Sequence, residues 1–347
     1  MEIGEKHMIA WVYDDLTRSL KLKKVEIPKP NQGELLIKVK ACGICGSDLH
    51  LFRRNIPIRV FIRNIINNLM KSNRGKEVER ILGHEVAGIV VESRDEKFNI
   101  GDRVAVFPKT PLGNIGETLP GCFAEYMVVP SSVALKIPNH ISYEEAALLE
   151  PLGSVLHAVK KLNKIMLDKD SKRTLIIGAG TIGLLILQVL KYMKTVDEVC
   201  MSDKYPHKLE IAKKNGADCV LTPSELSRKY NSYFNVVFEA VGGFAIENTV
   251  NQAIEVLKEN GVIILLGAVE ISPKIRLGIF HTKEGILAAS FTLTYHDYID
   301  AFNLVNSREI NVAQLVTHKF PLIEAPKAVK VALTRESIKT MLIGETT

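Results

Sequence analysis

The order of hydrophobic and polar residues predicts two kinds of segment along the chain. In the first third, short apolar runs separated by Gly and Pro predict strands at residues 35–39, 87–91, 103–106 and 126–129. From residue 174 onward the pattern changes, because strands at 174–177 and 199–202 are each followed by a helical pattern, at 182–192 and 207–214. Further strands are expected at 235–238, 262–266 and 285–290.

These patterns predict two domains. The short strands indicate a small barrel-like β domain, and the strand-helix alternation indicates a parallel, doubly wound sheet. After residue 290, helices and a last strand at 340–343 are expected to rejoin the first domain. We therefore expect a catalytic domain of residues 1–151 and 291–347 and a dinucleotide-binding domain of residues 152–290.

A glycine-rich turn follows the strand at 174–177. Gly178, Gly180 and Gly183 form a G-x-G-x-x-G motif between a buried strand and a helix. The first glycine permits a tight turn, the second lets the backbone approach a pyrophosphate, and the third allows close helix packing. The helix start, with Thr181 and Ile182, supplies amide donors and a favourable dipole.

Asp203 closes the next strand, 20 residues after Gly183. A carboxylate there accepts hydrogen bonds from the adenosine ribose and repels a 2'-phosphate, so the sequence favours NAD over NADP. Lys208 is a candidate for the adenosine end of the same site. The structural alternative for the motif is a plain glycine turn with Asp203 on the surface. The alternative for Lys208 is a solvated surface lysine.

Cys45, His84 and an acid form a candidate metal site. A catalytic zinc takes three thiolate, imidazole or carboxylate ligands and keeps one position open. Cys42 with Cys45 is alternatively a redox C-x-x-C, or half of a four-cysteine zinc site, but the chain has no second C-x-x-C. We expect Cys42 to be a buried thiol.

Composition excludes several other classes of function. The net charge is +6, but residues 53–80 alone hold eight Arg or Lys and two Glu, so the rest of the chain is neutral and nucleic-acid binding is not indicated. No apolar run reaches the ~18 residues of a membrane span. The polar start lacks the features of a secretory signal, so a cytoplasmic protein is expected. Its five cysteines make a disulfide framework improbable.

The basic segment itself predicts an amphipathic helix. Its apolar stripe consists of Ile58, Phe61, Ile62, Ile65, Ile66 and Leu69. One interpretation is a packed surface helix with solvated arginines. The other is that Arg59 and Arg63 reach the substrate and attract an anionic one, such as a sugar phosphate.

Taken together, the motifs resemble the zinc-containing medium-chain dehydrogenase family, and most closely its sorbitol and polyol branch. The resemblance rests on residues 42–50, 83–88, 101–104, 123–126, 145–152, 178–183 and 315–321. It implies a GroES-like β-barrel catalytic domain joined to a Rossmann domain. It also implies a homo-oligomer, with a tetramer favoured and a dimer as the alternative.

The resemblance assigns roles to residues of the metal site. Cys45 and His84 are implied zinc ligands, and Glu85 is a ligand or an adjacent alternate. Glu150 stands where other branches place a second cysteine, which implies a ligand or a carboxylate bonded to water on the zinc.

The same resemblance implies a route for the proton that the alcohol loses. Zinc makes the substrate hydroxyl acidic enough to lose its proton and expel hydride to NAD. Ser47 and His50 are implied to relay that proton to solvent, although a histidine there is also compatible with a plain surface position.

Two departures from the family pattern change what we expect of the number of zinc ions and of the substrate. Residues 107–122 contain Cys122 but not the four cysteines of a structural zinc lobe, so we expect one catalytic zinc per chain and no structural zinc. Thr292, Leu293 and Thr294 stand where polyol dehydrogenases have Phe-Arg-Tyr. The polyol-binding arginine is therefore absent.

The sequence thus predicts hydride transfer from a secondary alcohol to NAD. The small-molecule substrate is a polyol, cyclitol or sugar alcohol, with or without a phosphate. Alternatives are an amino alcohol such as threonine, or a simple secondary alcohol such as butanediol. A catalytically silent binding protein and a zinc-free quinone reductase are disfavoured, since neither has a use for the complete metal set.

Overall fold

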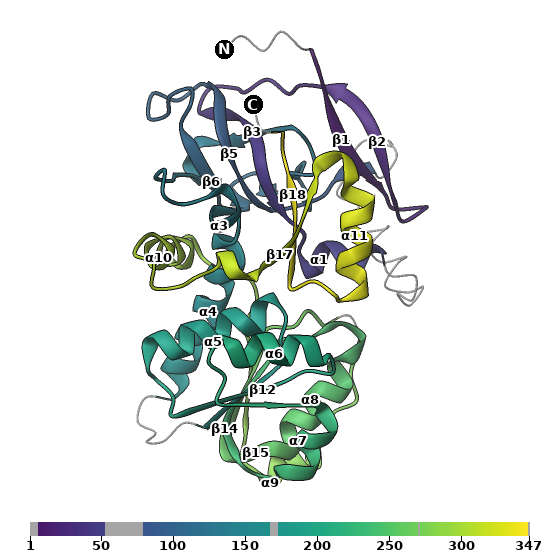
Figure 1. The fold of residues 1–347 in the computed structure, drawn as a ribbon, viewed down its shortest axis with the longest axis vertical. Coiled ribbons are helices and arrows are strands. Elements are labelled where there is room, and N and C mark those ends of the chain that lie inside the picture. Colours follow the sequence, from purple (N-terminus) through teal and green to yellow (C-terminus); the bar gives the residue numbers. More distant parts are fainter. Residues whose placement is uncertain (1–5, 53–78, 167–172, 270, 346–347) are drawn as a thin grey trace. The chain divides into compact units, whose positions relative to one another are not determined.

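The chain divides into two compact units. The computed structural model describes residues 6–52, 79–166, 173–269 and 271–345 (Figure 1). The first unit is Met1–Leu149 with Val316–Thr347, and the second is Glu150–Leu315. The boundaries expected from the sequence differ from these units at residues 150–151 and 291–315. The physical reason is that the segment around Asp297 packs and hydrogen-bonds within the second unit.

The first unit is built on a seven-stranded sheet, which confirms the predicted β domain. The sheet order is β10-β6-β5-β3-β18-β17, and β9 also pairs with β3. These strands are β3 (Glu34–Gly43), β5 (Glu85–Ser93), β6 (Arg103–Val106), β9 (Tyr126–Pro130), β10 (Ala134–Lys136), β17 (Val316–Pro321) and β18 (Lys339–Ile343). Because β17 and β18 belong to this sheet, the end of the chain rejoins the first unit as expected.

Smaller elements complete the first unit. A three-stranded sheet has the order β2-β1-β4, and β7 and β8 form a short hairpin. These strands are β1 (His7–Asp14), β2 (Ser19–Glu26), β4 (Glu79–Ile81), β7 (Lys109–Thr110) and β8 (Gly113–Asn114). The α-helices are α1 (Gly46–Phe52), α3 (Tyr143–Ala147) and α11 (Ala325–Thr334), and short 3-10 turns are η1 (Ser131–Val133) and η4 (Leu322–Glu324).

The second unit is a six-stranded, wholly parallel sheet covered by helices (Figure 1). Its strand order, β13-β12-β11-β14-β15-β16, is that of a Rossmann fold. The strands are β11 (Arg173–Ile177), β12 (Glu198–Ser202), β13 (Cys219–Leu221), β14 (Phe234–Glu239), β15 (Leu257–Leu265) and β16 (Ile286–Ala289). The helices are α4 (Leu149–Ile165), α5 (Thr181–Met193), α6 (Pro206–Lys214), α7 (Pro223–Lys229), α8 (Ile246–Val256), α9 (Leu277–Thr282) and α10 (Tyr295–Asn306), with 3-10 turns η2 (Gly243–Ala245) and η3 (Ala313–Leu315).

Side chains alternate between the two faces of this sheet, as the period of two requires. Leu175 and Ile177 of β11 belong to an apolar cluster with Val250 and Ile254 of α8. Ile176, between them, points to the opposite face, where α5 begins. β11 is therefore buried on both faces, which explains its continuous apolar sequence.

Two disulfides contradict the expected absence of a disulfide framework. Cys42 pairs with Cys122, and Cys200 pairs with Cys219, while Cys45 is free. Cys42 is buried as expected, but it is not a thiol. Cys200 and Cys219 are register partners on neighbouring parallel strands, a proximity that sequence spacing alone does not reveal.

The basic helix predicted within residues 53–80 falls outside the described residues, apart from the two that begin β4. Of these, Arg80 forms an ion pair with Asp15 at 3.0 Å and lies over the ring of Tyr13. Among the described residues, no helix has the length and apolar character that crossing a membrane requires.

Candidate metal centre and dinucleotide site

Three potential metal ligands converge in the first unit. Ligand atoms of Cys45, His84 and Glu85 all lie within 4.8 Å of one another. Zinc binds sulfur at about 2.3 Å and imidazole nitrogen or carboxylate oxygen at about 2.0–2.2 Å, so such a cluster spans the right distance around one ion. The mixture of thiolate, imidazole and carboxylate also suits zinc. The residues present therefore fit the metal that the sequence predicts.

Strand pairing brings the first two motifs together. Cys45 lies two residues after β3, while His84 immediately precedes β5 and Glu85 begins it. Since β3 and β5 are antiparallel, with Gly43 opposite Glu85, the end of one strand meets the start of the other. Residues about 40 positions apart in the chain thus become neighbours through ordinary antiparallel pairing.

Asp48 supports this centre, although sequence reasoning did not single it out. Its carboxylate accepts a hydrogen bond of 2.9 Å from the Cys45 amide and lies 3.9 Å from Nδ1 of His84. Burial raises the pKa of the Asp48 carboxyl, in spite of the opposing effects of His84 and the Cys45 amide. A carboxylate behind a metal-binding imidazole helps to orient the ring. The available signal was an acid three residues after Cys45.

Lys339 is a second partner that the sequence did not reveal. This buried lysine, the first residue of β18, donates to both carboxylate oxygens of Glu85 at 2.7 Å and to the carbonyl oxygen of Ile44 at 3.2 Å. The ion pair compensates the charge of a carboxylate that has no solvent exposure. Because 254 residues separate the two partners, no local pattern links them.

Ser47 and His50 lie on the short helix α1. Ser47 is exposed and His50 is half-buried. A spacing of three residues puts both on one face of the helix, which begins directly after Cys45. This arrangement is compatible with the relay expected from the sequence.

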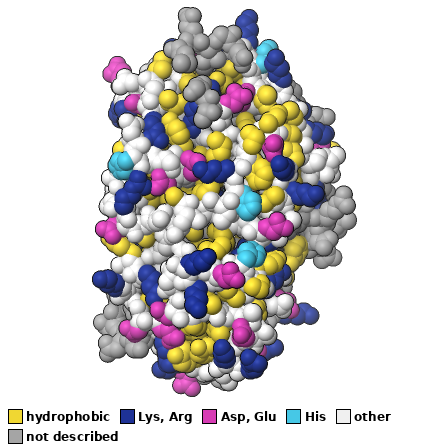
Figure 2. All heavy atoms as spheres, viewed as in Figure 1, with side chains coloured by type: hydrophobic (Ala, Val, Ile, Leu, Met, Phe, Trp, Pro, Cys, Tyr) yellow, Lys and Arg dark blue, Asp and Glu magenta, His cyan; other side chains and the backbone are white. Residues whose placement is uncertain are grey.

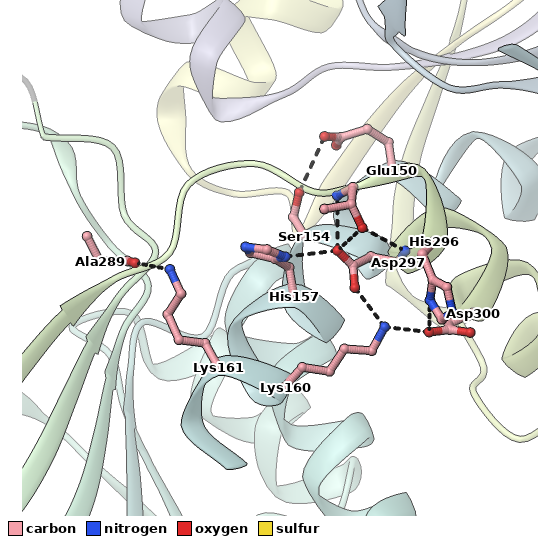
Figure 3. Close-up of polar contacts among 10 residues, drawn as sticks. Glu150, Ser154, His157, Lys160, Lys161, Ala289, His296, Asp297 and Asp300 are labelled. Atoms are coloured by element: carbon pink, nitrogen blue, oxygen red, sulfur yellow. Dashed lines mark hydrogen bonds and ion pairs between the residues drawn. The ribbon is translucent and has the colours of Figure 1, made fainter. Parts of the chain in front are cut away.

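Glu150 lies in the second unit, in the first turn of α4. The hydroxyl of Ser154 donates to its carboxylate at 3.4 Å (Figure 3). The pKa of the Tyr298 hydroxyl is raised, mainly by its burial and next by the negative charge of Glu150. Glu150 therefore stands at one end of a polar stripe on α4.

That polar stripe continues toward α10 (Figure 3). Nδ1 of His157 lies 2.9 Å from Oδ2 of Asp297, and Lys160 donates to Oδ1 at 2.7 Å. Lys160 also pairs with Asp300. Burial opposes ionisation of Asp297, but hydrogen bonds from Lys160, Thr294 and His157 outweigh it and hold its pKa well below the usual range. This network joins α4 to α10. It gives His157, which had no role assigned from the sequence, a structural role in that contact.

The glycine motif forms the predicted turn between β11 and α5. Gly183 is needed for close packing, because a Cβ there would lie 1.8 Å from the carbonyl oxygen of Gly178. A Cβ on Gly180 would meet no atom within 4 Å, so the space above it is open. Thr181 and Ile182 begin α5 and are half-buried. An open glycine at a helix amino terminus is a cradle that fits a pyrophosphate.

Asp203 and Lys208 lie beside this turn. Oδ2 of Asp203 accepts from the Ala179 amide at 2.8 Å, and Oδ1 accepts from the Tyr205 amide at 2.9 Å. Each oxygen retains a lone pair for a ribose hydroxyl. Lys208 is buried, and this burial lowers the pKa of its ammonium group. The negative charge of Asp203 acts in the opposite direction but does not cancel the shift in pKa. The structure thus groups the residues predicted for the cofactor at the carboxyl ends of β11 and β12.

Comparison with known families agrees with both halves of this description. Residues 31–139 match the model of the alcohol dehydrogenase GroES-like domain, and residues 181–307 match that of the zinc-binding dehydrogenase domain. The first match contains His84 and Glu85, and the second begins at the start of α5.

Individual relatives extend over nearly the whole chain. The chain is 29% identical to a D-xylulose reductase of Saccharomyces cerevisiae, over 93% of this chain and 94% of that enzyme. It is 28% identical to the sorbitol dehydrogenase of Ovis aries, over 93% of each. A zinc-binding dehydrogenase of Sinorhizobium meliloti 1021, solved with NADP, superposes with a TM-score of 0.81 at 25% identity, covering 98% of this chain and 100% of that one.

Proposed function

Since the chain belongs to the zinc-containing medium-chain dehydrogenase family, we propose that it transfers hydride from a secondary alcohol to NAD. The observation that carries this proposal is the convergence of Cys45, His84 and Glu85 within 4.8 Å. The substrate class is a polyol, cyclitol or sugar alcohol, with or without a phosphate. The names of the yeast and sheep relatives support a polyol.

In this proposal Cys45 and His84 hold one catalytic zinc, with Glu85 or Glu150 as the carboxylate of the set. When bound, zinc acts as a Lewis acid that favours loss of the alcohol's proton. Asp48 orients His84, and Lys339 neutralises Glu85. The residues 107–122 supply no cysteine lobe, which supports one zinc per chain.

The protein's own groups then move the proton and hold the coenzyme. We assign Ser47 to receive the proton and His50 to pass it to solvent from the same face of α1. The amides at the start of α5 bind the pyrophosphate, and Asp203 binds the adenosine ribose, with Lys208 nearby. When bound, the coenzyme would supply the hydride acceptor, so no further protein group is assigned to that step.

Two observations bear on the class of substrate. Leu293 is buried and Thr294 caps α10 by accepting from the Asp297 amide, so neither supplies a substitute for the missing arginine. Basic and acidic side chains are interspersed on the face drawn in Figure 2, which is unlike the basic stripe of a nucleic-acid-binding protein. The first observation supports substrate contacts that differ from those of sorbitol, and the second supports a small-molecule substrate.

We also propose that the protein is a homo-oligomer, with a tetramer favoured over a dimer. Within the described part of the chain, β16 ends the six-stranded sheet without a neighbour on its outer side. Large apolar side chains are exposed on and around it: Leu277, Ile286, Leu287 and Phe291. An apolar sheet edge is stabilised when a second copy covers it.

Substrate profiling tests the proposed activity. NADH formation should be measured with polyols, cyclitols, their phosphates, threonine and butanediol. The proposal expects the highest kcat/KM with a polyol, cyclitol or sugar alcohol. A higher value for threonine or butanediol would replace the substrate class, and no NADH with any alcohol would favour a silent binding protein.

A further inference from the structure

A buried glutamate joins the loop that follows β14 to the loop that follows β15. Glu239 is the last residue of β14 and has no solvent exposure. Its Oε1 accepts from the amides of Val241 and Gly242 at 3.0 Å each, and from the Thr249 hydroxyl of α8 at 2.8 Å. One carboxyl oxygen thus fixes the loop 240–243 to the first turn of the following helix.

The same residue also holds the loop after β15. Its backbone carbonyl accepts from the Leu266 and Gly267 amides at 2.9 and 3.1 Å, and Gly243 donates to the carbonyl oxygen of Ala268 at 2.7 Å. Oε2 of Glu239 lies so close to Gly267 that a Cβ there would be 2.4 Å from this oxygen. Loops 240–243 and 266–269 are therefore packed as one body around this carboxyl group.

This body abuts the glycine turn of the candidate coenzyme site. A Cβ on Gly178 would lie 2.8 Å from a methyl carbon of Val241, and the Ala240 amide donates to the carbonyl oxygen of Ile177 at 2.9 Å. β11 and β14 are the neighbours at which the strand order reverses. Ligands of open parallel sheets bind at this reversal, outside the carboxyl ends of the strands.

The symmetry of the fold assigns the two halves of a dinucleotide. Each half of a Rossmann sheet binds one mononucleotide. Asp203 lies in the half formed by β11, β12 and β13, which leaves the nicotinamide to the half formed by β14, β15 and β16. Loops 240–243 and 266–269 are the carboxyl-end loops of that second half.

We propose that Glu239 is a positioning residue for the nicotinamide half of the coenzyme, because its carboxyl group sets the spacing of loops 240–243 and 266–269 against the glycine turn. This inference rests on the proposed use of NAD. Burial raises the pKa of the Glu239 carboxyl, although hydrogen bonds from Gly242 and Thr249 oppose it. A neutral side chain with an acceptor oxygen in the same place should therefore serve equally well.

Calorimetric titration with NAD and with ADP-ribose, which lacks the nicotinamide ring, tests the inference on the zinc-loaded protein. In Glu239→Ala, we expect the Kd for NAD to rise by about tenfold or more and the Kd for ADP-ribose by about threefold or less. Glu239→Gln should restore most of the NAD affinity. Glu198→Ala, which removes a carboxylate at the opposite end of the same sheet, should leave both Kd values unchanged.

The inference is overturned if Glu239→Ala leaves the ratio of the two Kd values unchanged. It is also overturned if Glu239→Gln does not restore the affinity for NAD. If Glu239→Ala does not fold, Thr249→Val decides, because it deletes one donor to Oε1 in a half-buried position. The ratio should then shift in the same direction by a few-fold. Wild-type protein that binds neither ligand would instead refute the proposed use of NAD.

Discussion

We propose that Asp203 determines whether the protein prefers NAD or NADP. Its carboxylate lies at the end of β12 and holds the Ala179 amide of the glycine turn. Asp203→Asn retains a side-chain acceptor but removes the charge that repels a 2'-phosphate. We expect the preference for NAD in kcat/KM to narrow by about tenfold, which corresponds to ~1.4 kcal/mol.

The comparison of Asp203→Asn with Asp203→Ala separates charge from loop support. The alanine variant also loses the acceptor for Ala179, so KM should rise for both coenzymes. Asp218→Asn is a control near the other end of β12, where Asp218 accepts hydrogen bonds from Lys191 and from the Val199 amide, and it should retain the wild-type preference for NAD. If Asp203→Asn has an unaltered preference, Asp203 does not face the ribose.

At the scale of helices, the α4–α10 contact depends on an ionised Asp297. A carboxyl group with a lowered pKa stabilises the folded state fully above its unfolded pKa of about 4, and this contribution is lost as the pH falls further. Asp297→Asn should therefore lower the Tm at pH 7 by several degrees, through loss of charged hydrogen bonds worth about 1.5–3 kcal/mol each.

The difference in Tm between wild type and Asp297→Asn should shrink as the pH falls from about 4 to 3. Thermal unfolding followed by circular dichroism measures it. Glu324→Gln, which removes an exposed pair with Lys327, should scarcely change the Tm at any pH. A difference that stays constant from pH 7 to pH 3 would mean that ionised Asp297 is not what holds the two helices.

The elements also mark where sequence reasoning succeeds. Periodicity predicted β6 at residues 103–106 and α5 at 182–192, because buried faces repeat locally along the chain. Cys45 and His84 were predicted as ligands because their motifs are local, and the structure brings them together. The pairs Glu85–Lys339 and Cys42–Cys122 were not predicted, because the fold brings together residues that are distant in sequence.

For the whole molecule, the exposed apolar edge at β16 predicts self-association. Phe291 is 87% exposed, so Phe291→Asp should fold normally but disfavour any assembly that buries this residue. Light scattering coupled to gel filtration should find a smaller species for this variant than for wild type. Leu112→Asp changes a similarly exposed side chain in the first unit and should retain the wild-type mass. A monomeric wild-type protein would exclude the proposed oligomer.

The central claim is that a single zinc, held by Cys45 and His84, makes the protein an alcohol dehydrogenase. The most direct test measures NADH formation from the best polyol or cyclitol substrate together with zinc content, before and after removal of the metal by a chelator and after its return. We predict one zinc per chain, loss of activity on removal and recovery on return, with neither zinc nor activity in Cys45→Ser. Undiminished activity in the metal-free protein, or two zinc ions per chain, would contradict the account.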